Sequence, residues 1–200
     1  MLYIKFNIQD LSKFEDFRKL YQHMQCTREP GFNFNQDNSD PEIDWDKKKT
    51  QEEIDAAVKE LSDYLDQSSA FHRYQEHIPS YVNTFYNNYL EYDNNKLGQL
   101  GTLDTISIFN YLEAGFEVEL VQLTKFRKSG ILKFTTANYP FGGLERFFIT
   151  LKAYHLIATE CYNGFTTNKI EWTSNFEYNE IEIPKKNSFL IQLLHLITRS

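Results

Sequence analysis

The chain has 200 residues, a net charge of −7 at neutral pH and a high aromatic content, with 17 Phe and 13 Tyr. Such a chain can bury one sizeable core or the cores of two small lobes, which argues against a disordered protein. Its acidic balance lacks the basic stripe that nucleic-acid binding requires, and its N-terminus alternates apolar and polar residues, unlike a signal peptide or a membrane span. We therefore expect neither a nucleic-acid nor a membrane partner.

Cysteine usage bears on the compartment in which the protein works. Cys26 and Cys161 are far apart in the sequence, and a secreted chain of this size usually carries more cysteines. One disulfide stays open as the alternative to two reduced thiols. The frequent Asn, Ile, Lys, Tyr and Phe are typical of an AT-rich bacterial or phage genome, so we expect reduced thiols and a cytoplasmic location.

The N-terminal segment predicts a strand followed by a helix. Residues 2–8 alternate apolar and polar side chains, which is typical of a half-buried strand. Ser12 and Glu15 have the spacing of a capping box, so a helix should begin there and run to about Cys26. Residues 28–49 then form a polar, turn-rich loop that is long for a compact domain, which indicates a functional or mobile segment.

Three more helices are expected before the spacing of apolar residues changes from that of a helix to that of a strand. Thr50 and Glu53 form a second capping box, and another helix should start at Ser80. Residues 93–101 suit a hinge, and a short helix should end at Gly115 in the left-handed conformation. The helix after Thr50 has the clearest amphipathic pattern, with apolar positions Ile54, Val58, Leu61 and Leu65.

In the second half of the chain, apolar and polar residues alternate with the period of two that is typical of strands. Residues 116–136 predict one hairpin, and Asn163-Gly164 predicts the two-residue tip of another, with both residues at positive φ. Residues 176–183 predict a further strand, and a final amphipathic helix should follow Pro184. Between the hairpins, one side of a helix should consist of Leu144, Phe147, Phe148, Leu151 and His155.

This order of elements predicts an α+β fold, in which an N-terminal helical half is followed by a mostly antiparallel sheet backed by helices. The helical half spans residues 1–95 and contains the acidic loop 28–49, and the second half spans residues 102–200. We expect one compact domain or two tightly packed lobes.

Residues 138–147, NYPFGGLERF, raise the question of a phosphate-binding loop. Such loops place several glycines at a helix N-terminus, and a P-loop adds Lys and Ser or Thr. Here only Gly142 and Gly143 are present, and Glu145 in the first turn would repel a phosphate while it stabilises the helix dipole. We interpret the stretch as a joint between strand and helix, with no bound anion.

No cluster in the sequence predicts catalysis, a metal or a cofactor. Cys161 with His155 could act as a nucleophile and its base, but a cysteine at a strand end is more often a small buried apolar residue. His72 and His77 are five residues apart, whereas helical metal ligands are three or four apart, so exposed, unpaired histidines fit better. His23 is expected on a helix as an isolated residue. Whether the chain is an enzyme stays open, with a non-enzyme favoured.

The acidic residues of 37–46 surround a tryptophan. A calcium loop would need ligands at alternate positions, a central Gly and a closing Glu, and Pro41 interrupts that pattern. Carboxylates around an aromatic anchor are typical of a binding rim, so we predict a partner-binding loop, with a plain solvated loop as the alternative. The predicted binding residues are Asp37, Asp40, Glu42, Asp44, Trp45 and Asp46.

Two functional hypotheses follow. The first is a non-catalytic bacterial or phage binding protein that docks an acidic surface on a basic protein partner, comparable in type to immunity proteins and inhibitors. The second is a small-molecule-binding protein or enzyme with a pocket between the helical half and the sheet. The residues of that alternative pocket would be Tyr139, Glu145, Arg146 and Cys161.

Overall fold

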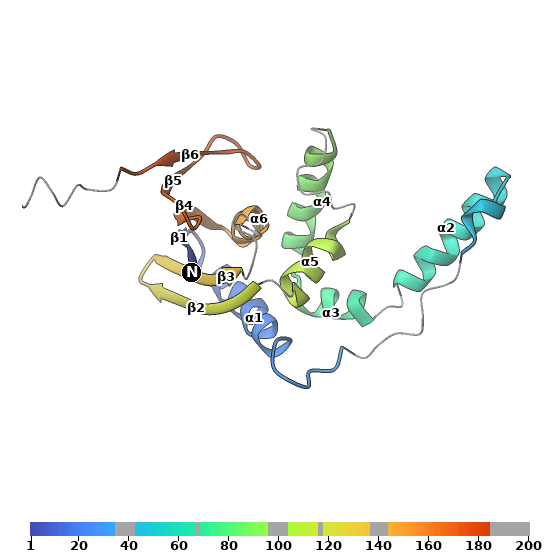
Figure 1. The fold of residues 1–200 in the computed structure, drawn as a ribbon, viewed down its shortest axis with the longest axis horizontal. Coiled ribbons are helices and arrows are strands. Elements are labelled where there is room, and N and C mark those ends of the chain that lie inside the picture. The colour runs from blue at the N-terminus through green and yellow to red at the C-terminus, as the bar shows by residue number, and fades with distance from the viewer. Residues whose placement is uncertain (35–42, 67–68, 96–103, 116–117, 137–143, 185–200) are drawn as a thin grey trace, which may run out of the picture.

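The fold is described by a computed structural model (Figure 1). For residues 61–66 and 94–95 the description is limited to the backbone. The described ranges are 1–34, 43–66, 69–95, 104–115, 118–136 and 144–184. Their elements are β1 (Leu2–Ile8), α1 (Leu11–Cys26), the 3-10 helix η1 (Trp45–Lys47), α2 (Gln51–Asp66), α3 (Ser69–His77), α4 (Ser80–Asn95), α5 (Thr105–Ala114), β2 (Val118–Phe126), β3 (Ser129–Thr136), α6 (Leu144–Ala153), β4 (Leu156–Tyr162), β5 (Thr167–Trp172) and β6 (Tyr178–Glu182).

All six strands belong to one sheet in the order β2-β3-β1-β4-β5-β6, and every neighbouring pair is antiparallel. The predicted α+β fold is therefore confirmed, as are the hairpin β2–β3 and the strand before Pro184. β1 lies at the centre of the sheet, where it pairs with both β3 and β4. The first strand of the chain thus joins the sheet of the second half.

Helices α1 and α3–α6 cover one face of the sheet in two layers (Figure 1). α6 packs on β4 and α1 on β2, and α3, α4 and α5 then pack on these two helices. We call the sheet with α1 and α3–α6 the body. Alternate side chains of β1 explain why only one face is covered: Leu2, Ile4, Phe6 and Ile8 are buried, whereas Lys5 and Asn7 are exposed.

Gly130 is required by the packing of β3 on β1. It pairs with Phe6, and a Cβ at this glycine would lie 2.4 Å from Cζ of the Phe6 ring. Phe6 is fully buried, so its ring has no space into which to move. The ring therefore covers the glycine across the two strands.

The two predicted capping boxes have different outcomes. Thr50 and Glu53 form theirs, since Glu53 Oε2 accepts the Thr50 N–H at 3.0 Å and Thr50 Oγ1 accepts the Glu53 N–H at 3.3 Å. The box at Ser12 is wrong, because Asp10 caps α1 and accepts both the backbone N–H and the hydroxyl of Ser12. A carboxylate is the stronger acceptor, and Asp10 lies closer to the helix start.

Two predicted backbone conformations are also wrong. Gly115 ends α5, but its φ is −56°, and glycine is needed there because a Cβ would lie 2.4 Å from the Tyr111 carbonyl oxygen. In the hairpin β4–β5 only Gly164 has positive φ, at 101°. The strands are joined by residues 163–166, and the Asn163 side chain accepts two backbone N–H groups across the turn. The asparagine closes the turn through its side chain instead of adopting positive φ.

Helix boundaries bring further corrections. His155 lies beyond α6 in a left-handed conformation, φ 56°, and not on the apolar side of the helix, although the other four predicted residues of that side are buried. α3 was not expected from the sequence. The hinge at 93–101 begins inside α4, and its remainder lies outside the described residues. So do Gly142, Gly143 and the helix predicted after Pro184. Among the helices of the described ranges, none has the length and apolar character to span a membrane.

Candidate functional site

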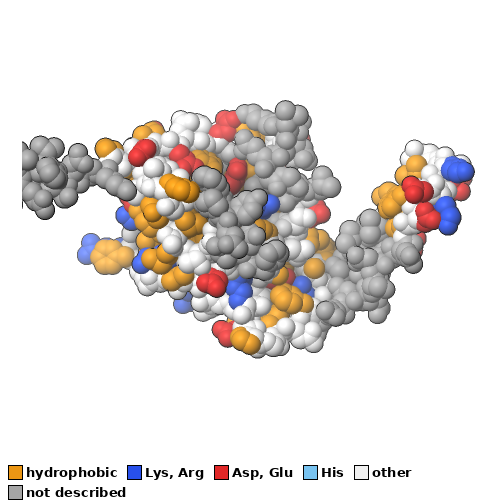
Figure 2. Space-filling view, viewed as in Figure 1, with side chains coloured by type: hydrophobic (Ala, Val, Ile, Leu, Met, Phe, Trp, Pro, Cys, Tyr) orange, Lys and Arg blue, Asp and Glu red, His pale blue; other side chains and the backbone are white. Residues whose placement is uncertain are grey.

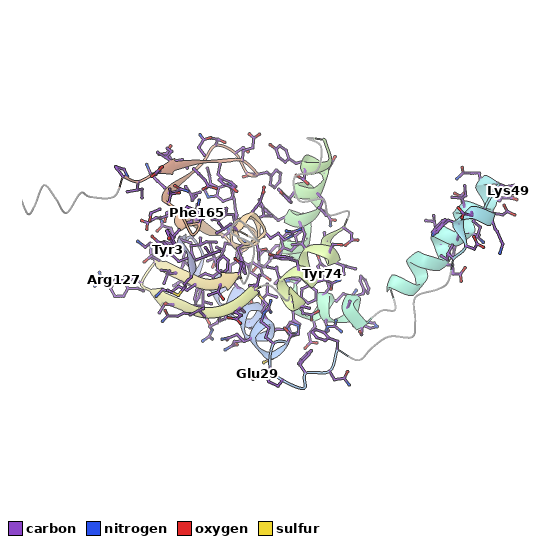
Figure 3. The ribbon with its side chains drawn as sticks, viewed as in Figure 1. Tyr3, Glu29, Lys49, Tyr74, Arg127 and Phe165 are labelled. Atoms are coloured by element: carbon purple, nitrogen blue, oxygen red, sulfur yellow. The ribbon has the colours of Figure 1, made fainter. Side chains whose placement is uncertain are left out.

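A projecting segment carries three of the six residues that the sequence predicts for partner binding, Asp44, Trp45 and Asp46. We call residues 43–66, comprising η1 and α2, the arm. In Figure 1 α2 extends away from the body, and Figure 3 shows Lys49 at the far end of the arm, well separated from Tyr74 among the helices of the body. The capping box described above fixes the start of α2 directly after η1.

The arm exposes large apolar side chains. Trp45 is 48% exposed, Ile54 36% and Val58 52%. Ile54 and Val58 are four residues apart and therefore lie on the same side of α2. Figure 2 shows hydrophobic side chains on the surface of the arm beside charged ones. The predicted amphipathic helix is thus formed. On the described part of its apolar side Ala57 is buried, whereas Ile54 and Val58 are exposed.

The predicted binding loop is described in part. Asp44, Trp45 and Asp46 are exposed on η1 or next to it, and the Asp44 carboxylate forms an ion pair of 2.7 Å with Lys47. Exposed pairs of this kind contribute little to stability. Asp37, Asp40 and Glu42 lie outside the described residues. The structure therefore places Trp45 on the surface and describes three of the six predicted binding residues.

Of the four residues of the predicted alternative pocket, the structure describes Glu145, Arg146 and Cys161, and these three do not line one pocket. Cys161 is fully buried in the core, and burial raises the pKa of its thiol to about 12, so it is not a reactive nucleophile. Arg146 stacks on Tyr111, with its guanidinium carbon 4.3 Å from the ring centroid. Tyr139 lies outside the described residues. Of the three described residues, Glu145 lines a pocket between the helices and the sheet.

That pocket, which we call the acidic pocket, has a volume of about 540 Å³. It lies between α4, the first turn of α6, and the turn and strand that follow β5. Its described lining includes no Lys, Arg or His. The lining residues are Tyr89, Tyr92, Asp93, Glu145, Thr173, Phe176, Glu177, Tyr178, Asn179 and Glu180.

Packing of the β5–β6 turn onto α4 positions the walls of the pocket. Phe176 packs against Tyr89 and Tyr92, with ring centroids 5.7 and 5.2 Å apart. The Tyr92 hydroxyl donates a hydrogen bond to Glu177, and the Lys152 ammonium donates one to the Ser174 carbonyl at 2.6 Å. On α4, Tyr89, Tyr92 and Asp93 are three and four residues apart, so they share one face.

The electrostatics of the pocket are unfavourable to the ionised form of Glu145. Burial and the charge of Asp93 raise the pKa of Glu145, although Glu145 lies in the first turn of α6, where a negative charge is favoured. The Tyr89 hydroxyl lies 3.5 Å from Glu145, and burial and the charge of Glu145 raise the pKa of Tyr89. Tyr89 therefore stays protonated and can only donate to a carboxylate.

A buried charged cluster lies at the opposite end of the helical layers, and sequence reasoning missed it. The Glu113 carboxylate is 1% exposed and lies 2.6 Å from His23 Nε2 and 2.7 Å from Arg73 Nε. The rings of His23 and His77 stack with centroids 3.7 Å apart. The expectation of isolated or exposed histidines is therefore wrong for His23 and His77. His72, on α3, is exposed as expected.

The cluster joins α1, α3 and α5 and acts in folding. Although burial raises the pKa of Glu113, hydrogen bonds from His23 and Arg73 outweigh it and hold this pKa below its ordinary value. Arg28 adds hydrogen bonds to carbonyl groups at the ends of α1 and α5. Within the described ranges, no group of three or more His, Cys, Asp or Glu side chains is arranged to hold a metal ion.

No protein-family model, curated protein or solved structure matches the chain. The functional argument therefore rests on the two surfaces described above, the arm and the acidic pocket.

Proposed function

We propose that the protein is a non-catalytic binding protein that docks its arm onto a protein partner with a basic surface. The observation that carries this proposal is the exposed apolar face on a helix that extends from the body. Ile54 and Val58 present adjacent anchors one helical turn apart, which is the spacing used when an amphipathic helix enters an apolar groove. Trp45, just before α2, supplies an aromatic anchor of the kind that dominates binding energy.

The charges of the arm support a basic partner. Residues 43–66 contain eight Asp and Glu against four Lys. Three of these lysines follow Asp46 directly, so the carboxylates near Trp45 are partly balanced. On α2 the balance is six acidic residues against Lys59 alone. The proposed docking surface therefore extends from the predicted loop along the helix, where complementary charge would speed association.

The position of the arm supports the proposed mode of action, because its exposed apolar side chains extend away from the body. A docked arm would block or escort its partner, as immunity proteins and inhibitors do. Cys26 is an exposed free thiol, and exposed thiols persist in a reducing compartment. Together with the base composition inferred from the residues, this supports action in the cytoplasm of a bacterium or of a phage-infected cell.

Capture of the partner by matched variants tests the proposal. Ile54→Ser with Val58→Ser removes the exposed apolar face, and Val121→Ser, at a residue that is 48% exposed on β2, removes a comparable side chain from the body. We expect a basic protein from the source organism to be captured by the wild type and by Val121→Ser but lost with the arm variant. Binding of the purified partner should then reproduce this order.

Two results would contradict the proposal. One is the same captured set for all three proteins. The other is a dimer of this chain in analytical ultracentrifugation that only the arm variant abolishes, because the apolar face would then belong to a second copy. Melting curves of the variants check that each one is folded.

A further inference from the structure

Aromatic side chains form much of the wall of the acidic pocket. Phe176 lies against Tyr89 and Tyr92 on one side, and Tyr178 lines the pocket from β6. Aromatic faces attract cations, and they also cover methylene groups of a ligand through burial of apolar surface. These walls favour a cation with an apolar body over a strongly hydrated inorganic ion.

Carboxylates from separate elements converge on the same space. Asp93 comes from α4, Glu145 from α6, Glu177 from the β5–β6 turn and Glu180 from β6. Bringing like charges together in a partly buried site is unfavourable, and a bound cation would relieve that repulsion. Four carboxylates spread over the lining suit a ligand with several positive charges along its length.

Two of the carboxylates are also held in place before any ligand arrives. Tyr92 donates to Glu177, and Asn168 Nδ2 donates to Glu180 at 2.7 Å. A carboxylate can accept more than one hydrogen bond, so a bond from the protein is compatible with one from a ligand. A site whose groups are already ordered loses less free energy on binding.

We propose that the acidic pocket binds a linear polyamine, an aliphatic chain that carries two or more ammonium groups. The ammonium groups donate hydrogen bonds to the carboxylates, and the methylene chain lies against Phe176 and the tyrosines. The volume of about 540 Å³ falls within the range of small-molecule sites, about 300–1,000 Å³. This site is independent of the arm, so the failure of either proposal leaves the other standing.

Calorimetric titration of the full chain with spermidine at physiological ionic strength tests this proposal. We expect saturable one-to-one binding that Glu145→Gln and Glu177→Gln each weaken about tenfold, because each removes a charged acceptor. Both variants keep the shape of the side chain. Glu119→Gln is the matched control: Glu119 is exposed on β2, at the opposite edge of the sheet from β6, and its loss should change the affinity by less than about twofold.

A second probe separates the polyamine from an inorganic ion. Mg²⁺ carries charge but no apolar body, so it should bind more weakly than spermidine. Phe176→Leu should weaken the binding of spermidine and leave the binding of Mg²⁺ unchanged. Three results would overturn the proposal: an affinity for Mg²⁺ equal to that for spermidine, the absence of saturable spermidine binding, or a loss of spermidine affinity in Glu119→Gln as large as in the two pocket variants. The last result would mean that spermidine merely follows the net charge of −7.

Discussion

The arm and the acidic pocket contain the same kinds of residue but present them in opposite shapes. In the pocket, Phe176 and the tyrosines of α4 form concave walls around carboxylates, and the body holds them by packing and hydrogen bonds. On the arm, Trp45 on η1 and Ile54 and Val58 on α2 are exposed on a segment that extends away from the body. Concave walls can enclose a small ligand, whereas a protruding face can be buried only by another surface. This difference in shape is the reason why we propose different classes of partner for the two acidic, aromatic regions.

The comparison predicts first that removing a carboxylate from the body costs stability and removing one from the arm does not. Glu113→Gln breaks the buried contacts with His23 and Arg73 and leaves Arg73 without its charge partner. We expect a loss of about 3 kcal/mol in the free energy of unfolding, measured by urea denaturation. Glu60→Gln, at an exposed position of α2, should change it by less than about 0.5 kcal/mol. Similar losses in both variants would remove the distinction between the two regions.

Acid should weaken the body through the same cluster. Burial and the neighbouring His23 lower the pKa of His77 below its ordinary 6.5, although Glu76 and Glu113 oppose this shift. The stability that comes from its neutral ring is present above about pH 6.5 and is lost as pH falls through the lowered pKa. Glu113, whose pKa is lowered from 4.5, contributes stability above that value and loses it at still lower pH.

Urea denaturation across these two pH windows measures the effect. His77→Gln should remove the loss of stability that begins near pH 6.5, and it should leave the loss of stability below pH 4.5 in place. A wild-type stability that stays constant through both windows would contradict the assignment of these groups.

The smallest expected change in the free energy of unfolding is a gain in stability, and it comes from a substitution in the acidic pocket. Because burial and Asp93 raise the pKa of Glu145, its contribution to stability is present below pH 4.5 and is lost as pH rises through the raised pKa. Glu145→Gln should therefore stabilise the protein at neutral pH, by less than about 1 kcal/mol, since it also loses a favourable helix-dipole contact. No gain is expected below pH 4.5. Destabilisation at neutral pH would show that the pocket carboxylates do not repel one another.

The parts of the fold that sequence predicts correctly are those governed by neighbours in the chain. The alternation of residues 2–8 and the capping box of Thr50 with Glu53 depend on contacts within a few residues, and both are present. The central place of β1 depends on pairing with strands more than a hundred residues away, which no local pattern reports. α3 was missed because its one fully buried side chain, Tyr74, gives no apolar repeat.

The sites follow the same rule. Exposure of Trp45 agrees with its assignment to a polar loop in the sequence. The acidic pocket was anticipated only through Glu145 and its position between helices and sheet, because its other residues come from α4 and from the turn and strand after β5. The cluster around Glu113 likewise contains residues from three helices. Taken alone in the sequence, each of these residues looks like an ordinary surface residue.

The central claim, that the arm docks a basic protein, is tested most directly by the kinetics of binding to the captured partner. Asp40, Glu42, Asp44 and Asp46 are neutralised together in one variant, and Trp45→Ala is the other. We predict that the first lowers the association rate at low salt, with a difference that shrinks as salt is added. Trp45→Ala should instead raise the dissociation rate, by about tenfold or more, because it removes a desolvated anchor. Rates equal to those of the wild type in both variants would contradict the claim.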